Sequence, residues 1–153
     1  MRGNGRYTER SAIVKFPELG LSMLHPQLAA DCHLLLEWPQ CQVLLNRNAL
    51  VPWFILVPRT EVVDLLDLPA KQREAVLDEA ARISRFIREK WDLQKINIAQ
   101  LGNVVPQMHL HVIGRSTMDD CWPRPVWGNL SDQKEYPDEE VRQIARQLSE
   151  FDR

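Results

Sequence analysis

The sequence is poor in the features that mark membrane, secreted or nucleic-acid-binding proteins. No stretch approaches the 18 consecutive apolar residues of a spanning helix, so we expect no membrane segment. Three cysteines without a Cys-x-x-Cys spacing predict reduced thiols in a cytoplasmic protein. A net charge of −2 lacks the basic excess of a general nucleic-acid binder. A small phosphorylated ligand stays compatible, because it needs only a local cluster of hydrogen-bond donors.

What is present suffices for one domain with one core, since the chain has 153 residues of which 44% are apolar. Apolar runs predict strands over residues 32–38, 41–45, 53–57, 95–101 and 108–115. Helical patterns cover residues 24–28, 61–66, 71–91 and a final segment that starts at Pro137. The last two strands are joined too tightly for a crossover helix, so we expect them to be antiparallel and the fold to be α+β. Residues 1–19 lack the apolar core of a signal peptide and are expected to form a partly mobile extension.

Residues 107–115 are the chemically richest stretch, because they contain two of the four histidines. Read as a strand, this stretch has an apolar face and a polar face. The apolar face holds Met108, Leu110 and Val112, and the polar face holds Gln107, His109 and His111. Imidazole can act near neutral pH as a nucleophile, an acid or base, or a metal ligand. An edge strand whose polar face meets only water is the simpler alternative.

Residues 107–113 resemble the histidine-triad signature His-φ-His-φ-His-φ-φ, where φ is apolar, with Gln107 in the place of the first His. Residues 45–58 are similar to the first conserved segment of that family, an Asn, a turn with Pro and an apolar strand. Residues 97–105 are polar, contain Gly and precede the signature, where the family has its phosphate-contacting loop. The resemblance covers about residues 20–130. The Gln, together with Trp122-Pro123 and Val126-Trp127-Gly128, looks like a bacterial branch of the family.

The resemblance implies a five-stranded antiparallel sheet and a two-fold homodimer. The helical patterns add one long helix and, within residues 131–153, a C-terminal helix that packs on the same domain. It also implies a nucleotide substrate and no cofactor. The middle His of the family, matching His109, attacks the α-phosphate of a nucleotide and forms a covalent nucleotidyl-histidine. The third, matching His111, contacts the phosphate and assists the leaving group. Gln107 departs from the pattern, because an amide can donate a hydrogen bond but cannot shuttle a proton near pH 7.

Three asparagines match or lie near substrate contacts of the family. Asn46 matches an Asn that contacts the nucleoside, Asn103 lies on the phosphate-contacting loop, and Asn97 lies near a further Asn or Gln contact. Asn also favours tight turns, so turn formation is the alternative for each. Arginines could attract a polyphosphate, but we interpret them as surface charges; they are Arg47, Arg59 and Arg115.

Three functions are compatible with these observations. The first is a nucleotide hydrolase or transferase that cleaves dinucleoside polyphosphates or nucleoside phosphoramidates through His109. The second is a nucleotide-binding module without turnover, because the triad is incomplete. The third is a metalloprotein in which His109 and His111 are joined by a third ligand. Candidates for that ligand are Asp119, Asp120 and Cys121.

Overall fold

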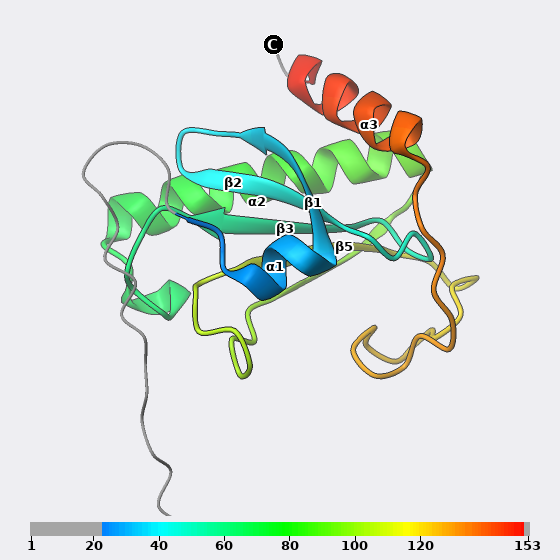
Figure 1. Ribbon diagram of the computed structural model, residues 1–153, viewed down its shortest axis with the longest axis horizontal. Helices are drawn as coiled ribbons and strands as arrows, with labels where there is room; N and C mark the ends of the chain where they lie inside the picture. The colour runs from blue at the N-terminus through cyan, green and yellow to red at the C-terminus, as the bar shows by residue number, and fades with distance from the viewer. Residues whose placement is uncertain (1–22, 152–153) are drawn as a thin grey trace, which may run out of the picture.

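The computed structural model describes residues 23–151 as an antiparallel sheet with helices on both sides (Figure 1). The strands are β1 (Cys32–Glu37), β2 (Cys41–Asn46), β3 (Trp53–Pro58), β4 (Lys95–Ala99) and β5 (Leu110–Arg115). The helices are α1 (Pro26–Asp31), the 3-10 turn η1 (Leu65–Asp67), α2 (Ala70–Trp91) and α3 (Asp138–Glu150). This confirms the predicted α+β class and five-stranded antiparallel sheet. The extension expected at residues 1–19 lies outside the described residues.

The sheet has the strand order β1-β2-β3-β5-β4, and every neighbouring pair is antiparallel. β1 and β2 form a hairpin, with its turn at residues 38–40. β5 lies between β3 and β4, so ladders on both sides hold the strand that carries His111. The predicted antiparallel pairing of the last two strands is therefore confirmed.

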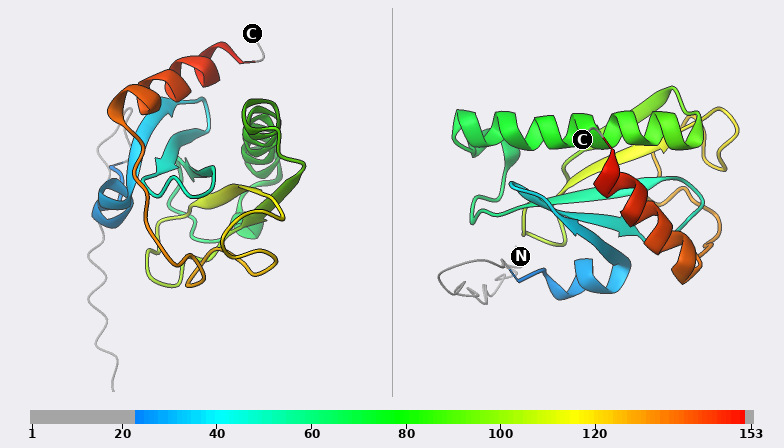
Figure 2. Two further views of the ribbon diagram at one scale, coloured as in Figure 1. Left: turned by 90° about the vertical axis from the view of Figure 1, so that its right-hand side faces the viewer. Right: turned by 90° about the horizontal axis from the view of Figure 1, so that it is seen from above.

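Alternating side chains of β3 show how the sheet separates two cores. Phe54 and Leu56 pack into the cluster that α2 and α3 cover, whereas Trp53 and Ile55 face the opposite side together with Leu28 of α1. Figure 2 (right) shows the sheet between α2 and α1. Every residue of β3 is buried, which agrees with the unbroken apolar run of residues 53–57. The sheet thus presents one face to the helical core and the other to the candidate site.

The long helix α2 buries a single stripe of its surface against the sheet. The stripe consists of Val76, Ala80, Ile83, Phe86 and Ile87. The helix ends at Trp91, and the next residue, Asp92, has a φ of 52° in the left-handed region that often terminates helices. α3 adds Ile144 and Leu148 to the same core and packs against β1. Both helices therefore stabilise the face of the sheet that is turned away from the histidines.

Two strand ends differ from the prediction in a way that affects the site. β4 ends at Ala99 rather than at residue 101, and β5 begins at Leu110 rather than at residue 108. In the ladder Leu56 faces Leu110, so Pro58 would face Met108, and proline has no N–H to extend the pairing. Residues 107–109 therefore lead into the strand as a loop. The helical turn predicted at residues 61–66 is instead η1, at Leu65–Asp67.

The described residues also bear on two expectations from composition. No helix within residues 23–151 is long and apolar enough to cross a membrane. All three cysteines are buried and free, which agrees with the predicted reduced thiols. Burial raises the pKa of Cys32 to about 12, so this thiol stays neutral and unreactive near neutral pH.

Gly114 of β5 provides a test of the packing between the sheet and α2. A Cβ at this position would lie 2.6 Å from Cγ2 of Ile87 and 2.8 Å from Cδ1 of Leu93. We expect Gly114→Ala to lower the free energy of unfolding by about 1–3 kcal/mol, because overpacking forces neighbours from their preferred positions. Urea denaturation measures the change. The double variant with Ile87→Ala should lose less stability than the sum of the two single losses, since the nearer of the two clashing methyl groups is gone. Strict additivity would contradict the close approach.

Candidate active site

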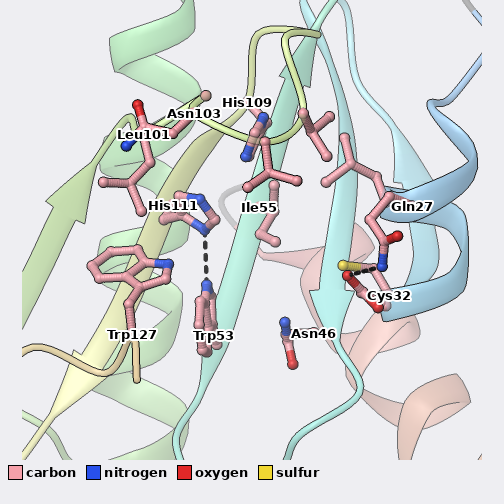
Figure 3. Close-up of a pocket in the computed structure, with 15 residues that line it drawn as sticks. Gln27, Cys32, Asn46, Trp53, Ile55, Leu101, Asn103, His109, His111 and Trp127 are labelled. Atoms are coloured by element: carbon pink, nitrogen blue, oxygen red, sulfur yellow. Dashed lines mark hydrogen bonds between the residues drawn. The ribbon is translucent and has the colours of Figure 1, made fainter. Parts of the chain in front are cut away.

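A pocket of about 450 Å³ opens on the face of the sheet opposite α2, a volume suited to a small ligand (Figure 3). Its floor is made by Trp53 and Ile55 of β3 and His111 of β5. One wall consists of α1 and the start of β1, the other of the loop between β4 and β5. The remaining lining residues are Gln27, Leu28, Asp31, Cys32, Asn46, residues 101–105, His109 and Trp127.

His109 lies in the loop just before β5 and is only 6% exposed. Its Nδ1 is 2.7 Å from the backbone oxygen of Gln107. A carbonyl oxygen can only accept a hydrogen bond, so Nδ1 carries the proton of the neutral ring. The lone pair of His109 is therefore on Nε2, so this nitrogen can act as a nucleophile.

His111 has the opposite arrangement. The indole Nε1–H of Trp53 donates to its Nδ1 at 2.9 Å, and an indole N–H can only donate. Nδ1 therefore holds the lone pair, and the proton of the neutral ring is on Nε2. Trp127 closes the other side, with ring centroids 5.0 Å apart. Burial, and next the charge of His109, lower the pKa of His111 to about 3, so this ring stays neutral near pH 7.

The two histidines thus offer complementary groups from rings whose centroids lie 4.9 Å apart. His109 has a lone pair on Nε2, and His111 has an N–H donor on Nε2. A nucleophile beside a fixed donor suits attack on a phosphoryl or acyl centre whose oxygen gains negative charge. The alternation predicted from Met108 to Val112 is confirmed, since Met108, Leu110 and Val112 pack in the helical core.

Asn46 and Asn103 line the same pocket as the histidines, at its two ends (Figure 3). Asn46 ends β2, and its Oδ1 accepts from the backbone N of Asn48 at 2.9 Å. This bond is the turn interaction that was the alternative for an asparagine, and it fixes the side chain at the pocket. Asn103 is exposed on the loop between β4 and β5. The structure therefore brings these two predicted residues together with the histidines.

Asn97 and Gln107 lie elsewhere. Asn97 of β4 accepts a hydrogen bond from Nη1 of Arg115 at 2.8 Å. The side chain of Gln107 accepts from the backbone N of His25 at 2.7 Å and donates to the backbone O of Met23 at 3.2 Å. Neither lines the pocket. The period-two pattern placed Gln107 beside the histidines, but that period applies only within a strand, and residue 107 precedes β5.

Arg115 is not the surface charge that we predicted. It is 2% exposed, and its guanidinium donates to both carboxylate oxygens of Asp119, at 2.7 and 3.0 Å. It also donates to the backbone O of Arg124 at 2.8 Å. These bonds hold the loop that carries Trp127 against His111. The sequence signal that could have predicted this ion pair is an Asp four residues after an Arg at the end of a strand.

The same contacts bear on the metalloprotein hypothesis. Asp119 binds Arg115, and Sγ of Cys121 also lies 3.5 Å from Nη2 of that residue. Neither side chain lines the pocket of His109 and His111. Across the described residues 23–151, no three His, Cys, Asp or Glu side chains gather closely enough to hold a metal ion. The predicted third ligand is therefore not brought to the histidines.

Comparison with known proteins gives concordant matches. The family model named HIT domain matches residues 27–118. A histidine triad protein structure from Bradyrhizobium japonicum is 38% identical, with a TM-score of 0.78, covering 84% of this chain and 96% of that one. One from Marinobacter aquaeolei is 39% identical with the same TM-score, covering 86% and 96%. The bis(5'-adenosyl)-triphosphatase of Saccharomyces cerevisiae is 32% identical over 79 residues, 47% of this chain. The match spans only 38% of that yeast protein.

The lowered pKa of His111 predicts a pH-dependent stability. The unfolded chain binds a proton at this ring below about pH 6.5, whereas the folded chain does not until about pH 3. The free energy of unfolding should therefore fall as the pH drops through this window, by about 1.4 kcal/mol per pH unit from this ring. Urea denaturation at pH 7 and pH 5 measures the loss, which should be smaller by about 2 kcal/mol in His111→Phe. Equal losses in both proteins would show that the ring is not held neutral.

Proposed function

The chain belongs to the HIT domain family, and from this premise we propose that it is a nucleotide hydrolase or transferase that acts at the α-phosphate of its substrate. The observation that carries the proposal is the pairing of a lone pair on Nε2 of His109 with an N–H on Nε2 of His111 in one pocket. The substrate classes are dinucleoside polyphosphates and nucleoside phosphoramidates. The name of the yeast relative, bis(5'-adenosyl)-triphosphatase, supports the first class.

In the proposed reaction Nε2 of His109 attacks the α-phosphorus, and the bond from phosphorus to the leaving group breaks. The leaving group departs with the bonding electron pair, and a nucleotidyl-histidine remains. The imidazole ring gains positive charge, which the backbone oxygen of Gln107 stabilises through the N–H on Nδ1. Water then cleaves the phosphorus–nitrogen bond, releasing the nucleoside monophosphate and restoring His109. A different acceptor in place of water gives the transferase reaction.

His111 supports this reaction as a hydrogen-bond donor. Its Nε2–H can bind a phosphoryl oxygen as negative charge develops there, and the low pKa keeps the ring in that neutral form. A neutral imidazole is a weak acid, so it protonates a strongly basic leaving group poorly. A phosphate leaving group needs less protonation than an amine. The site therefore suits phosphoanhydrides better than phosphoramidates of basic amines.

The pocket wall supports a nucleoside beside the phosphate. Asn46 and Asp31 can hydrogen-bond ribose hydroxyls, while Leu28 and Trp53 offer apolar surface to a base. Asn103, on the opposite wall, is the proposed phosphate contact. The predicted contact by Asn97 is less well supported, because its side-chain oxygen already binds Arg115.

The mechanism predicts that His109→Ala abolishes turnover of diadenosine tetraphosphate while AMP still binds. Position 109 faces the pocket and not the helical core, so the variant should fold. Turnover by chromatography and AMP binding by calorimetry provide the two measurements. Rapid quenching of the wild type with labelled substrate should trap a protein-bound nucleotide that is labile to acid and stable to base. His33→Ala, outside the pocket, is the matched control.

Other results would favour the alternative functions. Binding of AMP without turnover in the wild type would indicate a nucleotide-binding module. Activity that is lost in a chelator and restored by zinc would indicate a metalloprotein. Turnover by His109→Ala near the wild-type rate would contradict the covalent mechanism itself.

We also propose that the protein is a cytoplasmic homodimer whose sheets meet at β4. This strand ends the sheet, and the other end, β1, is packed by α1 and α3. Ile98 of β4 is 53% exposed, although its neighbour Ile96 on the same face packs against the core. Within the described residues, β4 pairs only with β5, and an edge strand with an exposed apolar side chain is a surface that a second copy can cover.

Ile98→Lys should shift the protein from dimer to monomer, because a charge at an edge strand opposes pairing between sheets. Light scattering at micromolar concentration should give about twice 17.8 kDa for the wild type and 17.8 kDa for the variant. Leu77→Lys is the control, since Leu77 is 41% exposed on α2. A monomeric wild type would contradict the proposal.

A further inference from the structure

Gln107 occupies the first position of the triad signature, yet its side chain is directed toward the chain before α1. Its Oε1 accepts from the backbone N of His25 at 2.7 Å, and its Nε2 donates to the backbone O of Met23 at 3.2 Å. One amide thus uses both an acceptor and a donor on two backbone groups more than eighty positions away. The backbone oxygen of the same residue accepts from Nδ1 of His109. Gln107 therefore connects the segment before α1, through its side chain, with the ring of His109, through its backbone oxygen.

His25 transmits this contact to α1. Its Nδ1 accepts from the backbone N of Gln27 at 3.1 Å, which caps the helix, and its backbone O accepts from the N of Ala29 at 3.0 Å. α1 has only six residues, a length at which a helix depends on tertiary contacts. The N-terminal end of the helix is thus tied to the bond between His25 and Gln107, whereas Arg47 holds its C-terminal end through the backbone oxygens of Ala30 and Asp31.

α1 supplies the wall of the pocket that suits a nucleoside. Leu28 is apolar, and Gln27 and Asp31 are polar and joined by a hydrogen bond of 2.8 Å. A carboxylate repels phosphate but accepts hydrogen bonds from ribose hydroxyls or from the amino group of a base. Moving this wall would therefore change nucleoside binding more than phosphoryl chemistry.

We propose that Gln107 is a positioning residue for the nucleoside wall: its side chain fixes α1, while its backbone oxygen orients the nucleophile. The proposal rests on the proposed function of the site. The first position of the signature then needs no group that transfers a proton, and the hydrogen bonds of a glutamine are sufficient for the positioning role. The two roles are separable by mutation, because every substitution keeps the backbone oxygen that binds His109.

The test compares Gln107→Leu, which removes both side-chain bonds, with Gln107→Glu, which keeps the acceptor for His25 and loses the donor to Met23. We expect KM for diadenosine tetraphosphate and Kd for AMP to rise about tenfold in Gln107→Leu, given the modest value of each hydrogen bond. The rise should be smaller in Gln107→Glu. The kcat should fall by less than about threefold, and its pH profile should not shift. Gln143→Ala, exposed on α3, is the matched control.

Amide hydrogen exchange provides a second measurement that does not require turnover. Protection of the His25 amide should be lost in Gln107→Leu and retained in part in Gln107→Glu. A wild type that binds AMP without turning over substrate would overturn the proposed activity, whereas the Kd and exchange comparisons would still decide the positioning role.

A kcat lowered a hundredfold with unchanged KM, or a shifted pH profile, would overturn the inference and assign Gln107 to the chemical step. An unchanged Kd for AMP together with lost protection of the His25 amide would show that nucleotide binding does not depend on the position of α1. This result would overturn the inference as well. A wild type that does not bind AMP would contradict both proposals.

Discussion

The hydrogen bond from Trp53 to His111 determines the chemistry that the pocket can offer. It exists because β3 and β5 are adjacent and antiparallel with Ile55 opposite His111, which puts the indole of Trp53 diagonally beside the imidazole. An N–H that can only donate forces the ring proton onto Nε2, and burial keeps the ring neutral. With the lone pair of the neutral His109 ring on its own Nε2, the site pairs a group that can attack with a neutral donor.

A buried charge supports this arrangement from the far end of β5. Arg115 pairs with Asp119 and also binds Asn97 and the backbone of Arg124, so it joins β4, β5 and the loop that follows. The loop brings Trp127 against His111, which excludes water from the ring. Breaking a buried pair by removing one partner typically costs about 3–5 kcal/mol, because the other charge is left without compensation. The interaction at the strand end therefore maintains the environment that keeps His111 neutral.

The helical face of the sheet has a different role. α2 and α3 bury apolar side chains against β3 and β5 and contribute no residue to the pocket. Their packing fixes the strands whose opposite faces carry Trp53 and His111. The walls of the pocket are a short helix and a loop, whereas its floor is part of the packed sheet.

The sequence by itself determined the α+β class, the five strands, and the presence of His109 and His111 on the face opposite the core. Those properties follow from periodicity and from spacing along the chain, which are local. Only the tertiary structure decided where β5 begins, because Pro58 of another strand limits the ladder. It also decided that Gln107 binds Met23 and His25 and that Arg115 is buried, since these partners are distant in sequence or set by a loop. The tautomers of the histidines likewise depend on a carbonyl and an indole, and no pattern of residue types records their geometry.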